Sequence, residues 1–456
     1  MLIAGCSNSL PNTRALIHAA LARDAAEDRR EAARDRGEAH AEVGKGGSQG
    51  EALALPPETE AAVSARLQRF IEIERAVTGA PLIGGNKVVL LQNGPAAYSA
   101  MFAAMRSARN SINLETFIFT DDEVGQKFAA LLIDARRRGV VVNVIYDSFG
   151  SKDTSSGFFA GLRQTGVSVV EFNPVNPFAA RHWWSLKHRD HRKLLIIDGK
   201  TAFTGGINIT GDYEKGLSGG PRSPAAPDLW RDTDVEIEGP AVAELQTLFV
   251  DQWVKQTGNL LPNADYFPDE DKPGDVMVRV IGSTQDSGFS RMYVTLVAAI
   301  WHAQRKVYIT TAYFAPDVQF MRALEQAGAH GVNVELILPR HSDYAVARYA
   351  AQTHYEDLLK AGVKIYERND AILHAKTVTI DGVWSSVGST NLDWLSFATD
   401  DEVNVSVLDS HFAQQLEQAF AADREQSTEV TAEGWANRSI RVRIRDWLAS
   451  TVQRWL

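Results

Sequence analysis

Two copies of one short pattern hold the residues of this sequence that could do chemistry. Each copy has the form His-x-Lys-x4-Asp, and the residues concerned are His191, Lys193, Asp198, His374, Lys376 and Asp381. Residues two apart in an extended strand point to the same face, so each copy presents an imidazole beside an ammonium group. The residues between each Lys and Asp are apolar or β-branched, which is typical of a buried strand.

Two imidazoles and two ammonium groups suit the chemistry of a phosphate diester. One histidine can attack phosphorus, the other can protonate the departing oxygen, and the lysines can hold the equatorial oxygens together with neutral donors. The neutral donors that follow the two copies are Asn208, Ser389 and Asn391. One copy alone would be equally well explained as chance surface chemistry, but two copies in an internal repeat favour a site. We predict no cofactor.

Histidines that lie close together before the first strand raise the alternative of a metal site. They are His182, His188 and His191. No carboxylate or cysteine accompanies them at the spacing of zinc ligands, so we predict that the site holds no metal.

Carboxylates follow each copy and could orient the histidines. Asp232 and Asp234 come after the first copy, and Asp400, Asp401 and Glu402 come after the second. An acid beside a catalytic histidine fixes its tautomer and raises its basicity. We predict that Asp232 and Glu402 have this role, with Asp234 as a close rival. The alternative is that these are solvated carboxylates at strand edges.

The elements that must position these residues are themselves repeated. The strand–helix–strand pattern of 88–119 is echoed at 277–314, and the glycine-containing segments at 138–146 and 162–167 have counterparts further along. Strands that alternate with helices predict an α/β fold with two similar mixed-sheet halves. If a pseudo-twofold axis relates the halves, both His-Lys strands meet in one cleft between them. The predicted divisions are a low-complexity, flexible segment at 1–60, the two halves at 61–262 and 263–428, and a basic amphipathic helix at 429–456.

Composition limits the classes of function. The chain has 456 residues, 45% of them hydrophobic, and a formal net charge of −10, which argues against a general nucleic-acid binder. Its single cysteine, Cys6, excludes an intrachain disulfide. No apolar run approaches the roughly 18 residues needed to span a bilayer, so work on a membrane would be done from its surface.

Both ends of the sequence bear on membrane attachment. Ile3-Ala4-Gly5-Cys6 is similar to the end of a bacterial lipoprotein signal, without its basic start and long apolar region. Either the chain begins further upstream and Cys6 is a lipid anchor, or the match is chance. At the other end, the apolar residues on one helical stripe are Ile440, Ile444, Trp447, Leu448, Val452, Trp455 and Leu456. Arginines cover the other faces, which fits either a helix in the interface of an anionic bilayer or a helix packed on the domain. Trp183 and Trp184 could likewise line an acyl-chain groove or simply pack.

The paired motifs in a duplicated α/β chain resemble the phospholipase D superfamily. Over 87–425, and most closely at 188–199, 205–210 and 373–393, the sequence is similar to bacterial cardiolipin synthases. The resemblance implies that a phosphatidyl group passes from one phosphatidylglycerol to another, giving cardiolipin and glycerol, through a phosphohistidine intermediate. It also implies a peripheral membrane enzyme whose partners are phosphatidylglycerol and an anionic membrane surface, and not nucleic acid.

The resemblance further implies a role for each motif residue. His191 and His374 share the nucleophile and acid/base roles, with the nucleophile placed on His191 by analogy. The phosphate is held by Lys193, Lys376, Asn208 and Asn391, whereas Asp198 and Asp381 shape the site. Two features depart from the family pattern. The paired N-terminal membrane helices of many cardiolipin synthases are not found, which leaves the mode of attachment open, and Ala312 stands where proline is expected.

Other functions remain compatible with the motifs. A phospholipase D would pass the same intermediate to water and release phosphatidic acid. A nuclease of the same superfamily is less consistent with the acidic charge, and an inactive membrane-binding module is less consistent with two intact His-Lys pairs.

Overall fold

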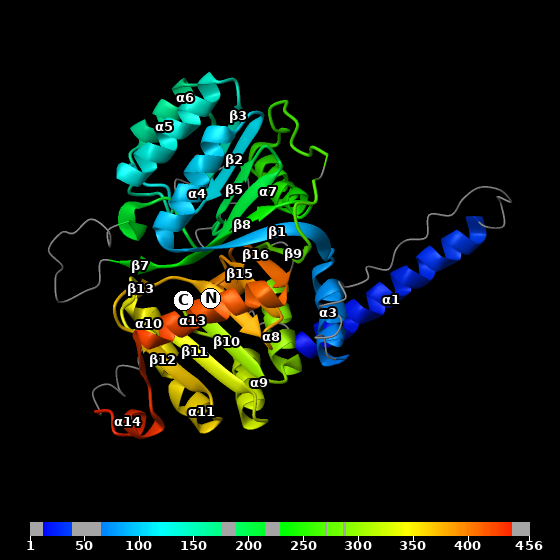
Figure 1. Cartoon of the computed structure of the whole chain (residues 1–456), viewed down its shortest axis with the longest axis vertical. Helices are drawn as coiled ribbons and strands as arrows, with labels where there is room; N and C mark the ends of the chain where they lie inside the picture. Colours follow the sequence, from blue (N-terminus) through cyan, green and yellow to red (C-terminus); the bar gives the residue numbers. More distant parts are fainter. Residues whose placement is uncertain are drawn as a thin grey trace, which may run out of the picture.

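The sheet of this protein is one continuous structure built from two copies of the same strand arrangement (Figure 1). The computed structural model describes residues 12–38, 65–174, 188–214, 229–269, 271–285 and 289–439. Cys6, Trp183, Trp184 and the apolar stripe predicted after residue 439 lie outside the described residues. Within the described residues, no helix combines the length and the apolar character that crossing a bilayer requires.

The first half alternates strands and helices, as the sequence predicts. In the helix that follows the second strand, Val124, Phe128, Leu132 and Ala135 are buried along one face, and Asp122 caps the first turn through the amides of the next residues. The strands are β1 (Ile83–Gln92), β2 (Ser111–Thr116), β3 (Val141–Asp147), β4 (Ser168–Phe172), β5 (Leu194–Ile197), β6 (Thr201–Gly205), β7 (Trp230–Arg231) and β8 (Thr233–Glu238). The helices are α4 (Asn93–Ser107), α5 (Glu123–Arg137), α6 (Ser156–Gln164), the short 3-10 helix η1 (Gly211–Tyr213) and α7 (Val242–Thr257).

The second half repeats this order. Its strands are β9 (Val276–Ser283), β10 (Lys306–Thr311), β11 (Asn333–Pro339), β12 (Lys364–Arg368), β13 (Ile372–Leu373), β14 (Lys376–Ile380), β15 (Trp384–Gly388), β16 (Glu402–Leu408) and β17 (Ser427–Glu429). Its helices are α8 (Arg291–His302), α9 (Val318–Ala329), α10 (Ala345–Gln352), α11 (Tyr355–Lys360), α12 (Trp394–Ala398), α13 (Ser410–Glu425) and α14 (Ala432–Ala436).

The strand order shows the pseudo-twofold relation directly. Outward from the centre, the first half runs β1-β8-β6-β5-β2-β3-β4 and the second runs β9-β16-β15-β14-β10-β11-β12, with β17 added at the edge. Strands β2, β3 and β4 pair in parallel, as do β10, β11 and β12, whereas the strands around them are antiparallel. The two halves join where β1 meets β9 in antiparallel pairing at Ile83 and Val278. The predicted α/β fold with two similar mixed-sheet halves is confirmed.

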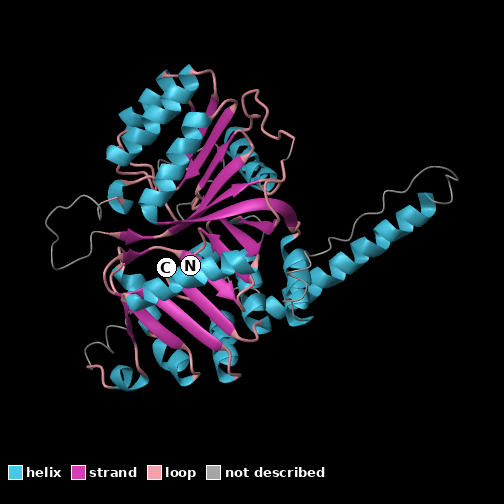
Figure 2. Cartoon of the chain, viewed as in Figure 1, coloured by secondary structure: helices cyan, strands magenta, loops and turns pink. Residues whose placement is uncertain are grey.

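Helices cover the sheet in layers (Figure 2). One core lies between α4, α5 and α6 and the first half of the sheet, and a second lies between α8, α9 and α11 and the second half. A third core combines α7 and α13 with strands of both halves. Because this shared core packs Phe249 and Phe412 among valines of both halves, it fixes how the halves are placed relative to each other.

Part of the N-terminal segment predicted at 1–60 is helical. Thr13–Glu38 forms helix α1, which runs away from the body of the molecule in Figure 1. Its first turns pack on helix α3 (Ala65–Thr78) and on α8, where Ile17 and Ala20 are buried. These apolar side chains, spaced three residues apart, give the helix a stripe that can be buried.

Candidate active site

The histidine of each motif lies just before a strand, and a backbone hydrogen bond to the other half of the molecule holds it there. The backbone N–H of His191, ahead of β5, donates to the carbonyl of Asp401 at 2.9 Å. The backbone N–H of His374, ahead of β14, donates to the carbonyl of Arg231 at 2.8 Å, next to the parallel pairing of β13 with β7. The structure therefore brings both histidines to the boundary between the halves.

The carboxylates that orient the histidines are exchanged between the halves. Nδ1 of His191 lies 3.0 and 3.2 Å from the two carboxylate oxygens of Glu402. Nδ1 of His374 lies 2.7 Å from Oδ2 of Asp232. Because Nδ1 of each ring faces an acceptor, the proton is held there and Nε2 carries the free lone pair. The sequence predicts both carboxylates, but not that each one serves the histidine of the other half.

A hydroxyl group contacts each of these carboxylates, and the two hydroxyls come from different places. Ser389, predicted to bind phosphate, instead donates its hydroxyl proton to Glu402. The equivalent position in the first half is Gly206, where a Cβ atom would lie 2.1 Å from Oδ1 of Asp232. There Tyr213 supplies the hydroxyl, 3.2 Å from Oδ2 of Asp232 and 3.2 Å from Nδ1 of His374.

Sequence reasoning did not find Tyr213. The residue that corresponds to it in the second copy, counted from Asn391, is Ser396, so the repeat gives no signal. The one signal in the sequence is Gly206, which stands at the position of Ser389 in the repeat. Because Gly206 has no side chain, the first half needs a hydroxyl from another residue.

Both histidines are neutral near pH 7. Burial lowers the pKa of His191 to about 4, in spite of Glu402, which raises it. The pKa of His374 is also lowered, first by burial and then by the charge of Lys376. Burial alone would raise the pKa of the two orienting carboxyls, but the neighbouring His and Lys side chains outweigh it and hold the pKa of Asp232 and of Glu402 below the ordinary value. The site therefore combines neutral imidazoles with ionised carboxylates, the states that a nucleophile and its orienting acid require.

The two lysines lie beside their histidines. Nζ of Lys193 donates to the carbonyl of His191 at 2.6 Å and lies 5.4 Å from the ring centre of Phe117. Nζ of Lys376 lies 2.8 Å from Nδ1 of His374 and donates to the carbonyl of the same residue. Burial lowers the pKa of Lys193 to about 7 and that of Lys376 to about 8. A bound phosphate would raise both pKa values again, because an anion nearby favours the ammonium form.

The lowered lysine pKa values predict a loss of activity at alkaline pH. As pH rises through about 7 to 8, the free enzyme loses the ammonium charges that hold the phosphate, so kcat/KM should fall. The value of kcat should hold to higher pH, because bound phosphate raises both pKa values. Steady-state kinetics between pH 5 and pH 10 check this. Equal pH dependence of kcat and kcat/KM would contradict it.

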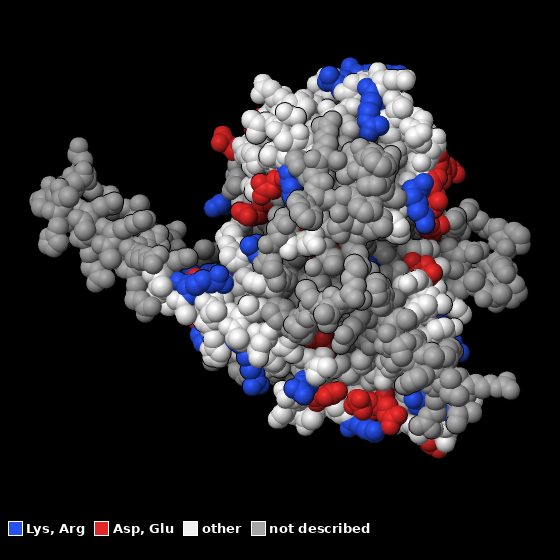
Figure 3. All heavy atoms as spheres, turned by 180° about the vertical axis from the view of Figure 1, so that it is seen from behind, with Lys and Arg blue, Asp and Glu red and all other residues white. Residues whose placement is uncertain are grey.

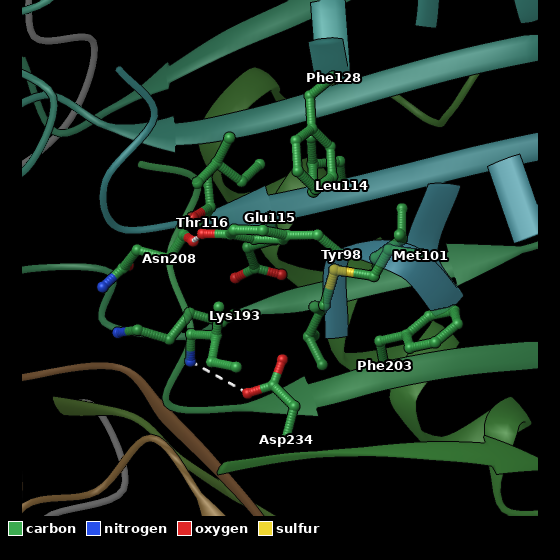
Figure 4. A pocket seen from close by; sticks show the side chains of 14 residues that line it. Tyr98, Met101, Leu114, Glu115, Thr116, Phe128, Lys193, Phe203, Asn208 and Asp234 are labelled. Carbon is green, nitrogen blue, oxygen red and sulfur yellow. Dashed lines mark hydrogen bonds between the residues drawn. The ribbon is translucent and has the colours of Figure 1, made fainter. Parts of the chain in front are cut away.

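The two predicted asparagines lie next to the lysines. Oδ1 of Asn208 accepts the backbone N–H of Ile118 at 3.2 Å, which leaves its amide nitrogen as a donor. Figure 4 shows this nitrogen and the ammonium group of Lys193 on the same side, directed away from the apolar side chains. Asn391 is buried, and its Oδ1 has no hydrogen-bond partner among the described residues. The amide of Asn208 is thus placed to offer an N–H donor beside Lys193.

Asp198 and Asp381 are not in the site, although the sequence groups them with the catalytic residues. Both follow the far end of their strands in a left-handed conformation, with φ of 54°. Asp198 accepts the backbone N–H groups of three residues at the start of β2: Arg109, Asn110 and Ser111. Asp381 accepts those of the equivalent residues at the start of β10: Gln304, Arg305 and Lys306. The motif aspartates therefore join neighbouring strands and do not transfer protons.

This placement predicts that Asp381→Ala lowers stability more than activity. The substitution leaves three backbone donors without their acceptor and puts alanine in a left-handed conformation, so the free energy of unfolding should fall by about 2–4 kcal/mol. Asp381→Asn keeps one acceptor oxygen and tolerates the conformation, and should cost roughly half as much or less. Denaturant unfolding gives the two values. A loss of activity per folded molecule comparable to that of a histidine variant would contradict the structural role.

Asp234, the rival to Asp232, does not contact a catalytic histidine. Its Oδ1 accepts the backbone N–H of Ile207 at 3.0 Å, and burial together with the charge of Asp232 raises the pKa of Asp234 to about 8. It borders a cavity of about 20 Å³ that Lys193 and Glu115 also line (Figure 4), enough for one water molecule.

His188, the other described candidate ligand near the first motif, faces a carboxylate. Nε2 of His188 lies 3.0 Å from Oδ1 of Asp401. The other oxygen of this carboxylate, Oδ2, accepts the side-chain amide of Gln252 at 2.9 Å. Among the described side chains, no group of three or more His, Cys, Asp or Glu residues is placed to hold a metal ion. His182 lies outside the described residues.

Comparison with known proteins places this site in a family. The family described as "Cardiolipin synthase, PLD-like domain" matches residues 101–216 and 296–424, one stretch in each half. A cardiolipin synthase of Geobacillus kaustophilus is 33% identical over 370 residues, which is 80% of this chain and 72% of that protein. A major cardiolipin synthase of Bacillus subtilis is 34% identical over 367 residues, 79% of this chain and 73% of the relative.

A solved structure shares the fold. The phosphatidylserine synthase of Haemophilus influenzae covers 85% of this chain over its whole length, with a TM-score of 0.59 and 13% identity. At that identity the likeness concerns the fold alone. Together with the matched stretches in both halves and the relatives above 30% identity, the paired sites define the family: the chain belongs to the cardiolipin synthases of the phospholipase D superfamily.

Proposed function

We propose that this protein transfers a phosphatidyl group from one phosphatidylglycerol molecule to another, releasing glycerol and forming cardiolipin. The observation that carries the proposal is the pair of neutral histidines, each with Nδ1 held by a carboxylate of the other half and each beside a buried lysine. Membership of the cardiolipin synthase family supports the choice of substrate.

The first step forms a covalent intermediate. Nε2 of His191 attacks the phosphorus of the first phosphatidylglycerol, and the bond from phosphorus to the glycerol headgroup oxygen breaks. His374, protonated once the anionic substrate is bound, gives its Nε2 proton to that oxygen, and glycerol leaves. Asp232 stabilises the protonated form of His374. Lys193 and Lys376, with the amides of Asn208 and Asn391, hold the equatorial oxygens.

The second step uses the same groups in reverse. His374, now neutral, takes the proton from the headgroup hydroxyl of a second phosphatidylglycerol. The resulting oxygen attacks the phosphorus, the bond between phosphorus and His191 breaks, and cardiolipin is released. Both histidines then return to their starting protonation states, so atoms and protons balance over the cycle.

The substrate places the reaction at a membrane surface. Phosphatidylglycerol is an anionic bilayer lipid, and we propose that the protein binds such a surface as a peripheral protein. A polyanion such as DNA is a poorer fit, because the net charge is −10. On the face seen in Figure 3, the basic side chains of the described residues lie in small separate groups, with acidic ones elsewhere on the same face.

A product assay tests the proposal. Purified protein is incubated with phosphatidylglycerol vesicles, and lipids and free glycerol are measured by mass spectrometry. Cardiolipin and glycerol in equal amounts are expected. Phosphatidic acid in place of cardiolipin would show that water is the acceptor and would refute the transferase. No lipid turnover by folded protein would refute lipid as the substrate, and nucleic-acid phosphodiesters would be assayed next.

A further inference from the structure

Two exposed aromatic side chains occupy equivalent loops in the two halves. Phe149 is 46% exposed and Tyr344 is 48% exposed. Phe149 follows β3 and Tyr344 follows β11, which are corresponding strands in the repeated sheet order. Single exposed apolar residues are ordinary, but two of them in loops related by the pseudo-twofold axis call for a common explanation.

The loop of Phe149 reaches the catalytic site of the first half. Its next residue, Gly150, lies so close to Phe117 that an added Cβ atom would be 2.2 Å from the carbonyl oxygen of Phe117. The hydroxyl of Ser151 donates to the same oxygen at 3.2 Å. The ring of Phe117 in turn lies 5.0 Å from that of His191. The loop that carries Phe149 is therefore packed against Phe117, the residue whose ring lies next to that of His191.

The loop of Tyr344 has the same relation to the second histidine. The preceding residue, Asp343, accepts the hydroxyl of Tyr313 at 2.9 and 2.8 Å. The ring of Tyr313 lies 6.4 Å from that of His374, and the charge of Asp343 is close enough to raise the pKa of His374. Two exposed aromatic residues thus flank the site from opposite halves.

A cation lies against Phe149, and the loop of Tyr344 also carries basic residues. Nζ of Lys152 lies 5.2 Å from the ring centre of Phe149. In the other loop, Arg340 is exposed, and Arg348, in the middle of α10, lies with its guanidinium 5.6 Å from the ring centre of the neighbouring Tyr349. An aromatic ring beside a cation is suited to the interface of an anionic bilayer, where the ring enters the headgroup layer and the cation meets lipid phosphate.

We infer that the rim formed by Phe149 and Tyr344 is the surface by which the protein docks on an anionic bilayer, with the paired histidines facing the lipid between the two aromatic contacts. The inference deepens the proposed function and rests on it for the identity of the substrate. Each half contributes one of the two docking residues, Phe149 from the first and Tyr344 from the second. A lipid headgroup would then reach both histidines without the lipid leaving the membrane.

Vesicle partition of the double variant Phe149→Ser/Tyr344→Ser tests the inference. Loss of two interfacial aromatic side chains should weaken binding to vesicles of mixed phosphatidylglycerol and phosphatidylcholine by about ten-fold or more. The apparent KM for vesicle substrate should rise to match, whereas monomeric short-chain phosphatidylglycerol should be turned over at the wild-type rate. Wild-type binding should be weaker on vesicles of phosphatidylcholine alone.

Phe267→Ser is the matched control. Phe267 is 52% exposed and lies beside Tyr266, whose carbonyl oxygen would be 2.5 Å from a Cβ atom at Gly199. Gly199 lies in the turn after β5, so Phe267 is near the end of that strand that is farther from His191. Its replacement should leave vesicle binding unchanged.

The possible results separate the docking surface from the proposed function. Unchanged binding in the double variant, an equal loss in Phe267→Ser, or no vesicle binding by the wild type would overturn the docking surface. If the double variant loses binding while the wild type turns over no lipid, the docking surface stands and the proposed reaction fails. Circular dichroism and thermal unfolding verify that all variants are folded.

Discussion

Replacing either His191 or His374 by alanine is expected to lower cardiolipin formation by about four orders of magnitude or more. The nucleophile cannot be replaced by water without losing the covalent route, and the acid/base histidine is needed in both steps. Initial rates with phosphatidylglycerol vesicles give the size of each loss. His411→Ala, at an exposed position on α13, is the control and should retain full activity.

The two histidine variants should differ in the intermediate that they form. With a phosphodiester whose leaving group is a nitrophenolate, departure needs no proton, so His374→Ala should still phosphorylate His191 and then stall. His191→Ala should form no intermediate. Mass spectrometry of peptides from enzyme quenched at alkaline pH, where a phosphohistidine survives, distinguishes them. A modified His374 in the wild-type enzyme would reverse the assigned roles, and an unmodified enzyme throughout would refute the covalent mechanism.

Replacing the orienting carboxylates by amides should cost about two to four orders of magnitude in kcat, because each amide is expected to force the wrong histidine tautomer. In Glu402→Gln, the hydroxyl of Ser389 donates to one oxygen position and so selects the amide oxygen there. The NH2 group then faces Nδ1 of His191. The position closer to Nδ1, at 3.0 Å, is then an N–H donor, which favours the tautomer with the ring proton on Nε2 and so removes the lone pair that attacks phosphorus.

The same argument applies to Asp232→Asn. The backbone N–H of Thr233 donates to Oδ1 of Asp232 at 2.8 Å, which selects the amide oxygen at that position. The NH2 group is then turned toward His374. Tyr213, whose hydroxyl contacts Oδ2, loses this acceptor and keeps the carbonyl of Gly206 at 3.3 Å.

A second substitution tests whether the tautomer is the cause. Ser389→Ala alone should lower kcat by about ten-fold, since it removes one hydrogen bond to a charged group. Combined with Glu402→Gln, it frees the amide to turn its oxygen toward His191, so the double variant should be more active than Glu402→Gln alone. Equal or lower activity of the double variant would show that the charge of Glu402 matters and the tautomer does not. Activity of Glu402→Gln within ten-fold of wild type would contradict both explanations.

The sequence by itself determines the parts of this protein that depend on local spacing. A period of two in a strand puts His and Lys of each motif on one face, and repetition of the pattern predicts two equivalent halves. The alternation of strands and helices determines the α/β class. Asp232 and Glu402 can be predicted as orienting acids because each follows a motif in the sequence, although the histidines that they contact lie 142 and 211 residues away.

Only the tertiary structure decided how these parts combine. The exchange of carboxylates between halves depends on the shared core of α7 and α13, which sets the two sheets against each other. Ser389, predicted to donate a hydrogen bond to phosphate, donates to Glu402. In the other half Gly206 stands at the position of Ser389, and Tyr213 supplies the hydroxyl that contacts Asp232. Asp198 joins neighbouring strands far from the histidines. A hydrogen bond forms between groups that packing brings within about 3 Å, and a one-dimensional spacing carries no information on contacts between distant segments.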